Sequence, residues 1–438
     1  MLPASQVMKQ LFFIQDNLTN KISYYHLVCF LVALPFDRFY SELIFISFVI
    51  HTLIHLRIEY VKRMQSKEVL VVAVIFLAGL LSTVYSTNKN QALTDASIQL
   101  ALILFPITIA CNGLDIKRYK EPLLKIFGFT CVASIAYLYV DALQTIQYFH
   151  LPVSALIETP FLNQNFSAPI ELHATYLSMY VAFSICIFLL LCLKEKPGSG
   201  RAGYICCILL LTMGMLQLSS RAVGIALIVM VVLVFPFFLV NAKRKILYAA
   251  TAIIWLLMLS FTVQHIGTFR ERYFSELGKD LSSHTTNIEV TEPRMVRWKA
   301  AMSLVAASPV IGYGGGTEIT LLKKKYFERK LYSSYLNQFN AHNEYLSLLI
   351  KTGMIGFLIY GFVLAYGCFI AWKKKDIAFA SFMVLIAITS ASENILDLNK
   401  GIFFYSFFFT LFLMANKKRH TDRGPMKTTG NQTNLSND

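Results

Sequence analysis

A histidine at the border between polar and apolar sequence has the chemistry of a general base. His342 lies in the run NAHNEYLSLLIKTGMIG, residues 340–356, where a polar stretch gives way to an apolar one. A neutral imidazole accepts a proton from a hydroxyl near neutral pH. An interfacial histidine with a polar tip is an equally good interpretation of the same position. A helix over this run would place six residues on one face: His342, Tyr345, Leu346, Leu349, Gly353 and Gly356.

Arginines recur where they could hold an anion, because the guanidinium fork matches the oxygens of a phosphate. Arg221 begins an apolar run in LSSRAVGIAL, residues 218–227. The small neighbours Ser219, Ser220 and Gly224 would let a phosphate group approach the guanidinium. An arginine that only anchors the end of a membrane helix would occupy the same position, so the spacing leaves both interpretations open.

Two further arginine contexts follow in a long polar segment. FRERYFSEL, residues 269–277, predicts a helix start that carries Arg272. EPRMVRWKAAMSLVAASPVIGYGGG, residues 292–316, predicts a second amphipathic helix. Arg294, Trp298 and Met302 are spaced four apart in it, so we expect Arg294 on the apolar face. There it would bind either an anion or a structural carboxylate.

The remaining histidines and the cysteines predict no metal site. His173 opens an apolar span in ELHATYLSMY and is a second-rank candidate for the site. His51 and His55 have a metal-like spacing of four, but no third ligand lies near them in the sequence. The eight cysteines lie in or beside apolar runs without metal or disulfide spacing, so we interpret them as small hydrophobic residues.

The elements that must position these side chains are membrane helices. Hydrophobic residues make up 56% and aromatic residues 14% of the 438 residues, which exceeds what a soluble core needs. Apolar runs of spanning length recur, and no segment alternates like a barrel strand. We predict an all-α integral membrane protein with about twelve spans, at 22–37, 41–57, 68–86, 95–112, 122–142, 172–193, 202–219, 222–240, 246–264, 347–371, 377–392 and 401–415.

The distribution of basic residues predicts the orientation. They follow every second span, near 62–67, 117–120, 194–201, 243–245, 373–375 and 417–423. By the positive-inside rule these loops and both termini are cytoplasmic. We therefore divide the chain into spans over 1–264, a periplasmic loop region with short helices over 265–343, spans over 344–415 and a disordered tail over 416–438. The net charge of +15 is explained by loops that lie against anionic lipids, so no nucleic-acid partner is predicted.

Several of these motifs together resemble the O-antigen ligase and polymerase superfamily. They are HNEYLSLLIKTGMIG, SSRAVG before a span, RMVRW, the SPVIGYGGG turn and SENILDLNKGIFFYSFF, in the family order between residues 170 and 412. The resemblance implies a glycosyltransferase of the GT-C type in the inner membrane of a Gram-negative bacterium. It would transfer glycan from undecaprenyl diphosphate to a sugar hydroxyl of the lipid A core in lipopolysaccharide biosynthesis, with no cofactor or metal and with inversion at the anomeric carbon.

The resemblance also assigns roles to residues. His342 would be the general base, and Arg221, Arg272 and Arg294 would hold the donor diphosphate. Arg294 is preferred over Arg297 because it precedes Trp298 by four residues, while Arg297, His173 and Asn343 are second-rank candidates. Three alternatives remain open: an O-antigen polymerase, a protein O-oligosaccharyltransferase with the same donor, and a lipid-linked sugar flippase. The flippase is disfavoured because the candidate residues gather at one face and no internal repeat is visible.

Overall fold

The computed structural model of the protein describes residues 13–36, 38–239, 242–280 and 292–417. Every regular element in these residues is a helix, and they contain no β-strand. The predicted all-helical class is therefore confirmed. The first twelve residues, residues 281–291 of the predicted loop region and the tail from residue 418 lie outside the described residues, so the disorder expected for the tail stays a prediction.

The chain up to His265 is a series of helices, most of them joined by short connections. The first group comprises α2 (Leu18–Ala33), α3 (Arg38–Ile54), α4 (Ile58–Val61), α5 (Lys67–Ser82), α6 (Lys89–Gln99), α7 (Ala101–Cys111) and α8 (Ile116–Tyr148). The second group comprises α9 (Gln164–Ser167), α10 (Ala174–Lys194), α11 (Ser199–Leu218), α12 (Arg221–Val229), a π-helical turn (Met230–Val234), α13 (Phe235–Phe238) and α14 (Ala242–His265).

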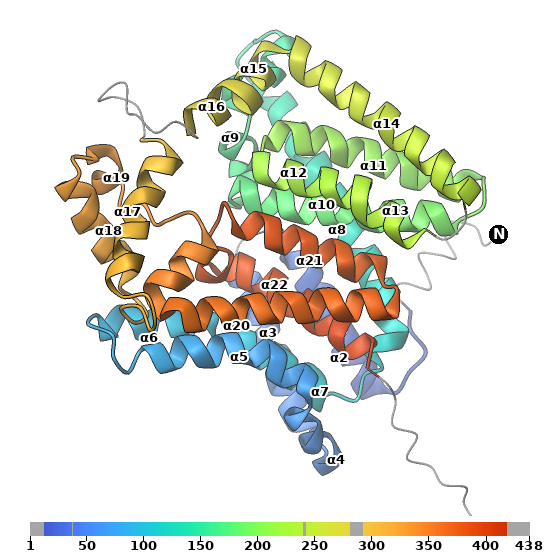
Figure 1. Ribbon diagram of the computed structural model, residues 1–438. Coiled ribbons are helices and arrows are strands. Elements are labelled where there is room, and N and C mark those ends of the chain that lie inside the picture. The colour runs from blue at the N-terminus through green and yellow to red at the C-terminus, as the bar shows by residue number, and fades with distance from the viewer. Residues whose placement is uncertain (1–12, 37, 240–241, 281–291, 418–438) are drawn as a thin grey trace, which may run out of the picture.

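Short helices then separate α14 from the last three long helices. They are α15 (Gly267–Arg270), a second π-helical turn (Glu271–Ser275), α16 (Glu276–Asp280), α17 (Arg294–Ala307), α18 (Glu318–Glu328) and α19 (Tyr332–Leu336). The chain ends in α20 (Glu344–Lys374), α21 (Ile377–Ser390) and α22 (Asn399–Ala415). In Figure 1, α17, α18 and α19 form a cap beyond the end of α20 at which that helix begins.

Seven helices among the described residues are long and apolar enough to cross a membrane. An eighth is added if the segments Ile58–Gln65 and Lys67–Ser82, which are bent by 60°, form one span. Three apolar helices of 10–17 residues complete the set: Phe39–Ile54, Ile377–Ser390 and Asn399–Ala415. Each predicted span overlaps a helix, so the protein is a multi-pass membrane protein, and the total of twelve spans stays a prediction.

Helix α22 is the central helix of the bundle. All its residues from Lys400 to Leu413 are buried. The ring centroid of Phe404 lies 5.9 Å from Phe127 of α8, 4.8 Å from Tyr180 of α10 and 5.5 Å from Phe382 of α21. A helix that is apolar on every side is stable only when other helices surround it. The phenylalanine-rich sequence of α22 therefore fixes the positions of α8, α10 and α21 around it.

Helix α20 is broken near its start by the glycine-rich turn that precedes α18. Gly353 has φ 64° and ψ −160°, a conformation that essentially only glycine adopts. At this break, the backbone N–H of Tyr313 donates to the carbonyl of Ile350 at 2.8 Å, and the N–H of Gly314 donates to that of Lys351 at 2.8 Å. The turn therefore docks onto the opened backbone of α20, which ties the cap of short helices to the membrane bundle.

Ion pairs show which elements lie at each end of the bundle. At one end, the connection between α20 and α21 lies near the start of α8, because Lys120 pairs with Asp376 at 2.8 Å. Lys417, after α22, pairs there with Glu68 at the start of α5 at 3.4 Å. The starts of α12, α17 and α20 lie at the opposite end, where the candidate residues gather (Figure 1).

Candidate active site

His342 and Glu393 lie close together at the open end of the hairpin that α20 and α21 form. His342 precedes α20, and Glu393 follows α21. Nδ1 of His342 lies 3.3 Å from Oε2 of Glu393. The next residue of each segment forms a second link, because the backbone N–H of Asn343 donates to Oδ1 of Asn394 at 2.8 Å. A carboxylate at Nδ1 selects the neutral tautomer that carries its proton there and leaves a lone pair on Nε2. The imidazole is therefore arranged to accept a proton at Nε2.

His342 does not lie on the helical face that the spacing predicted. Helix α20 begins at Glu344, and its N-cap is Asn343, whose side-chain oxygen accepts from the N–H of Leu346 at 3.1 Å. His342 itself is in the left-handed region with φ 44°, and its N–H donates to Oδ1 of Asn340 at 3.0 Å. The predicted face fails for two reasons: the cap ends the helix before the histidine, and Gly353 breaks it further along.

Glu393 is a buried carboxylate with several polar contacts. Nη2 of Arg294 lies 3.7 Å from Oε1, and the hydroxyl of Thr175 donates to the same oxygen at 3.5 Å. Burial alone would raise the pKa of Glu393, but the hydrogen bond from His342 and the nearby basic groups outweigh burial and hold this pKa below its usual range. Glu393 is therefore ionised at neutral pH and can orient the histidine.

A chain of ion pairs links Glu393 to the start of α12. Nη1 of Arg294 donates to the carbonyl of Ser392 at 2.9 Å, and its Nε lies 3.8 Å from Asp280. The same Asp280 oxygen accepts from Nη2 of Arg221 at 2.5 Å. The structure therefore brings Arg221 and Arg294 together with His342, as the sequence predicted, through one aspartate and one glutamate.

Arg272 lies on the same short helical segment as Asp280 but has different partners. It pairs with Glu276 one turn further along. When the Asn163 amide is turned so that both its nitrogen and its oxygen form hydrogen bonds, the oxygen accepts from Nη2 of Arg272 at 2.6 Å. The predicted helix start is confirmed by α15 and the π-helical turn after it. No hydrogen bond or ion pair among the described residues joins Arg272 directly to Arg294 or His342.

The buried face of α17 differs from the predicted one. Its buried residues are Arg297, Ala300, Ala301, Leu304 and Val305, whereas Met302 is 50% exposed. Arg294 is only partly buried at the first position of the helix, so the spacing of four placed it on the wrong face. The guanidinium of Arg297 lies 5.0 Å from the centroid of Phe339, and the Phe339 ring lies 5.8 Å from the ring of His342. Arg297 therefore packs close to the candidate base.

Three of the site arginines carry buried nitrogen atoms without a hydrogen-bond partner among the described residues. They are Nη1 of Arg221, Nε of Arg272 and Nε of Arg297. An unsatisfied buried donor costs about 1–3 kcal/mol, and more when the group is charged. An anion with several oxygen atoms would satisfy such donors. These three nitrogen atoms therefore have unused hydrogen-bonding capacity within the described residues.

Helix termini add to the positive potential at this site. Arg221 and Arg294 are the first residues of α12 and α17, His173 is the N-cap of α10, and His342 immediately precedes the N-cap of α20. Each helix start carries a partial positive charge, and a cation there costs roughly 0.3–1 kcal/mol. The arginines are thus placed where they oppose helix stability, which favours a role in binding an anion.

His173 and Asn343 hold the surrounding backbone. Nδ1 of His173 accepts from the N–H of Thr175 at 3.3 Å and so caps α10. Its ring packs on Tyr176 at 6.0 Å, while Thr175 contacts Glu393. Asn343 caps α20 in the same way and lines an open groove of about 490 Å³ with Trp298, Lys299 and Leu346 among others. Asn343, the residue after His342 in the chain, is thus part of this groove.

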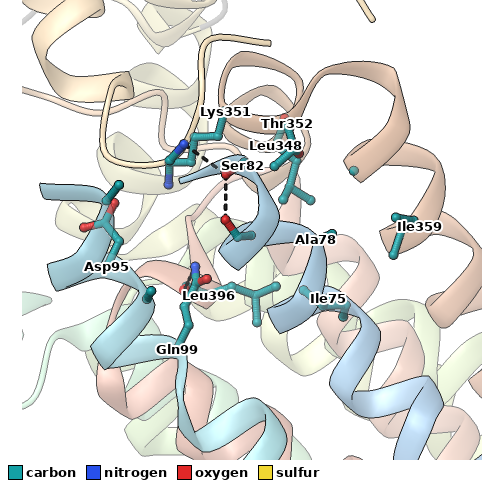
Figure 2. A pocket seen from close by; sticks show the side chains of 15 residues that line it. Ile75, Ala78, Ser82, Asp95, Gln99, Leu348, Lys351, Thr352, Ile359 and Leu396 are labelled. Carbon is teal, nitrogen blue, oxygen red and sulfur yellow. Dashed lines mark hydrogen bonds between the residues drawn. The ribbon is translucent and has the colours of Figure 1, made fainter. Parts of the chain in front are cut away.

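A buried polar cluster supports the histidine segment from below. Oε1 of Glu318 accepts from the N–H of Ala341 at 2.9 Å, and its Oε2 lies 3.1 Å from Nζ of Lys351. Nζ of Lys351 also lies 2.7 Å from Oδ1 of Asp397. Figure 2 shows the narrow cavity of about 30 Å³ beneath it, with Asp95 from α6 and Lys351 from α20 in its lining. The cluster holds the backbone on both sides of the site.

The sequence prediction missed Glu393, Asp280 and Glu318. Glu393 lies in SENILD, a short polar connection between two apolar spans, and a carboxylate at that place was the available signal. Asp280 and Glu318 had no such signal, because they are ordinary residues of a charged segment. Their importance depends on distances that only the fold defines.

The fold and the site define a class: a multi-pass helical membrane protein with a cluster of arginines, carboxylates and a histidine at one end of the bundle. Residues 205–361 match the family model described as O-antigen ligase. This match confirms the predicted resemblance to the O-antigen ligase superfamily over those residues. The family indicates a glycosyltransferase-like ligase or polymerase that acts in the transfer of O-antigen or related lipopolysaccharide glycans. No match was found among curated proteins.

Proposed function

We propose that the protein is an O-antigen ligase, which transfers glycan from undecaprenyl diphosphate to a sugar hydroxyl of the lipid A core. The observation that carries the proposal is the His342–Glu393 pair beside an arginine cluster, at the end of the bundle away from the basic connections. The family match, which covers Arg221, Arg272, Arg294 and His342, supports the same chemistry.

His342 is the proposed general base. The acceptor hydroxyl oxygen forms a bond to the anomeric carbon of the donor sugar while Nε2 of His342 takes the hydroxyl proton. The bond from the anomeric carbon to the diphosphate oxygen breaks, and undecaprenyl diphosphate leaves with that electron pair. One displacement of this kind inverts the anomeric configuration. General-base assistance typically accelerates such a step about 10²- to 10⁴-fold.

The arginines are proposed to hold the diphosphate and to stabilise its growing negative charge as the bond breaks. Arg221 and Arg294 share Asp280, and an anion that displaced this aspartate would find both guanidinium groups already in place. Fixed donors of this kind act without reorganisation at the moment of reaction. The reaction we propose therefore draws its charge stabilisation from arginines and is independent of divalent metal.

The acceptor is proposed to enter through the groove that Asn343 and Trp298 line, because Asn343 directly follows His342 in the chain. The indole N–H of Trp298 donates to the carbonyl of Ala341 at 2.9 Å, so one wall of the groove is fixed to the histidine segment. The basic connections at the opposite end of the bundle support a cytoplasmic location for that end and a periplasmic location for the site.

The test is a transfer assay in proteoliposomes with purified protein, an undecaprenyl-diphosphate-linked glycan and lipid A core, in the presence of EDTA. We expect glycan-bearing lipid A core as the product. Longer chains on the donor carrier without transfer to the core would replace the ligase assignment with that of a polymerase. Product that forms only after Mg²⁺ is restored would contradict the metal-independent mechanism.

Arg221→Ala tests the diphosphate grip in the same assay. We expect the variant to remain in the membrane and to lose most of its activity through a higher KM for the donor. Arg270→Ala is the matched control, because Arg270 is exposed on the neighbouring short helix and forms no ion pair with another described residue. Equal activity of the two variants would remove Arg221 from the proposed site.

A further inference from the structure

A cavity of about 300 Å³ lies at the end of the bundle opposite His342. It is bounded by the start of α8, the end of α10 and the connection between α20 and α21. Its rim carries five lysines, namely Lys120, Lys125, Lys194, Lys374 and Lys375, and its acidic residues are Glu121 and Asp376. The cavity is therefore strongly basic, and its volume equals that of about ten water molecules at roughly 30 Å³ each.

The two acidic residues are already engaged. Asp376 accepts from Nζ of Lys120 at 2.8 Å and from the amide of Asn416 at 2.9 Å, and it caps α21 through the N–H of Phe379. Glu121 is shared between two lysines, with Nζ of Lys125 at 3.2 Å and Nζ of Lys194 at 2.9 Å. Neither carboxylate forms an ion pair with Lys374 or Lys375.

Lys374 and Lys375 are the unpaired cations of this rim. Both are exposed, and neither forms an ion pair with another described residue. They sit at the carboxyl end of α20, where a cation is favourable for the helix, so helix stability explains part of their presence. Helix stability does not explain why the end of α10 and the start of α8 bring three further lysines to the same opening.

The wall of the cavity below the lysines is apolar. It is formed by Leu124 of α8, by Ile187, Leu190 and Leu191 of α10, and by Ile377 of α21. A free phosphate ion would need only the cationic rim. An apolar wall that continues from the rim toward the middle of the bundle fits a molecule with a phosphate group and an attached acyl chain.

We propose that this cavity binds the head group of an anionic phospholipid, with the phosphate at Lys374 and Lys375 and the first part of an acyl chain along α8 and α10. The site is separate from the proposed active site and does not depend on the proposed function. A bound lipid joins four helices, two of which, α10 and α20, begin beside Glu393 and His342 at the other end.

The test measures lipid binding to the full-length protein by native mass spectrometry after delipidation in detergent. The probes are phosphatidylglycerol, phosphatidylcholine and inorganic phosphate. We expect phosphatidylglycerol to remain bound under conditions that remove phosphatidylcholine, and inorganic phosphate at equal concentration not to displace it. Lys374→Gln combined with Lys375→Asn should weaken phosphatidylglycerol binding roughly tenfold to thirtyfold. Each lysine that contacts an anionic lipid strengthens binding by about tenfold or somewhat less, and the double variant removes two of them.

The matched control is Lys117→Gln with Lys373→Gln, which removes two charges from the same end without touching the cavity lining. We expect this control to bind phosphatidylglycerol like the parent. Asparagine at position 375 suits the positive φ of 54° there, so the backbone is retained. Equal weakening in both double variants, equal retention of the two lipids or displacement by inorganic phosphate would each overturn the proposal.

Discussion

At the scale of single residues, Glu393 is the least expected part of the site and the easiest to test. Its carboxylate holds Nδ1 of His342, and an amide in its place can present an N–H to that nitrogen and select the wrong tautomer. We predict that Glu393→Gln lowers kcat on the order of a hundredfold while the KM for the donor changes little. Ser392→Ala, which keeps the adjacent backbone, should retain parental activity; an equal kcat for Glu393→Gln and the parent would contradict this role.

The same carboxylate predicts a pH dependence of stability. The pKa of Glu393 in the folded protein is lower than its usual value because the bond from His342 and nearby basic groups outweigh burial. A depressed pKa contributes stability above the unfolded value, about 4.3, and this contribution is lost as the pH falls through the lower folded value. In detergent, the Tm of the parent should therefore fall more steeply below pH 4.3 than that of Glu393→Gln. Parallel Tm curves would refute the assignment.

At the scale of elements, the break in α20 is the feature on which the position of the histidine segment depends. An added Cβ at Gly353 would lie 2.3 Å from the carbonyl oxygen of Val310, and the backbone there is in a glycine-only region. We predict that Gly353→Ala destabilises the protein by about 1–3 kcal/mol or more. Gly361→Ala is the control, because nothing lies within 4 Å of its added Cβ and alanine is the better helix former. Thermal unfolding that ranks Gly353→Ala as the more stable variant would contradict the account.

The elements also show how far the sequence alone can lead. Hydropathy located a helix within every predicted span, because the long apolar runs of α10 and α22 have no alternative to a membrane helix or a buried core. The spacing argument failed at His342 and Arg294, because both lie at helix starts, where caps rather than the 3.6-residue period determine the direction of a side chain. The pairing of Asp280 and Glu393 with their arginines could not be predicted, since it depends on tertiary contacts, although the place of Glu393 between two apolar spans was a signal in the sequence.

At the scale of the whole molecule, the proposed function requires that the two ends of the bundle face different compartments. Single cysteines in a cysteine-free background test this with a membrane-impermeant maleimide on intact cells. A cysteine at Leu336, which is 74% exposed on α19, should react in intact cells with a permeabilised outer membrane. A cysteine at Lys373, at the end of α20, should react only after the inner membrane is opened. Labelling of both cysteines in intact cells, or the reverse pattern, would contradict the proposed orientation.

The central claim is that His342 is the base of a metal-independent glycan transfer. The most direct measurement compares His342→Ala with the parent in the reconstituted transfer assay, under single-turnover conditions in EDTA. His265→Ala is the matched control, since His265 is an exposed histidine at the end of α14. We predict that the parent and the control form product, and that His342→Ala forms it about 10²- to 10⁴-fold more slowly. Transfer by folded His342→Ala at the parental rate would contradict the account.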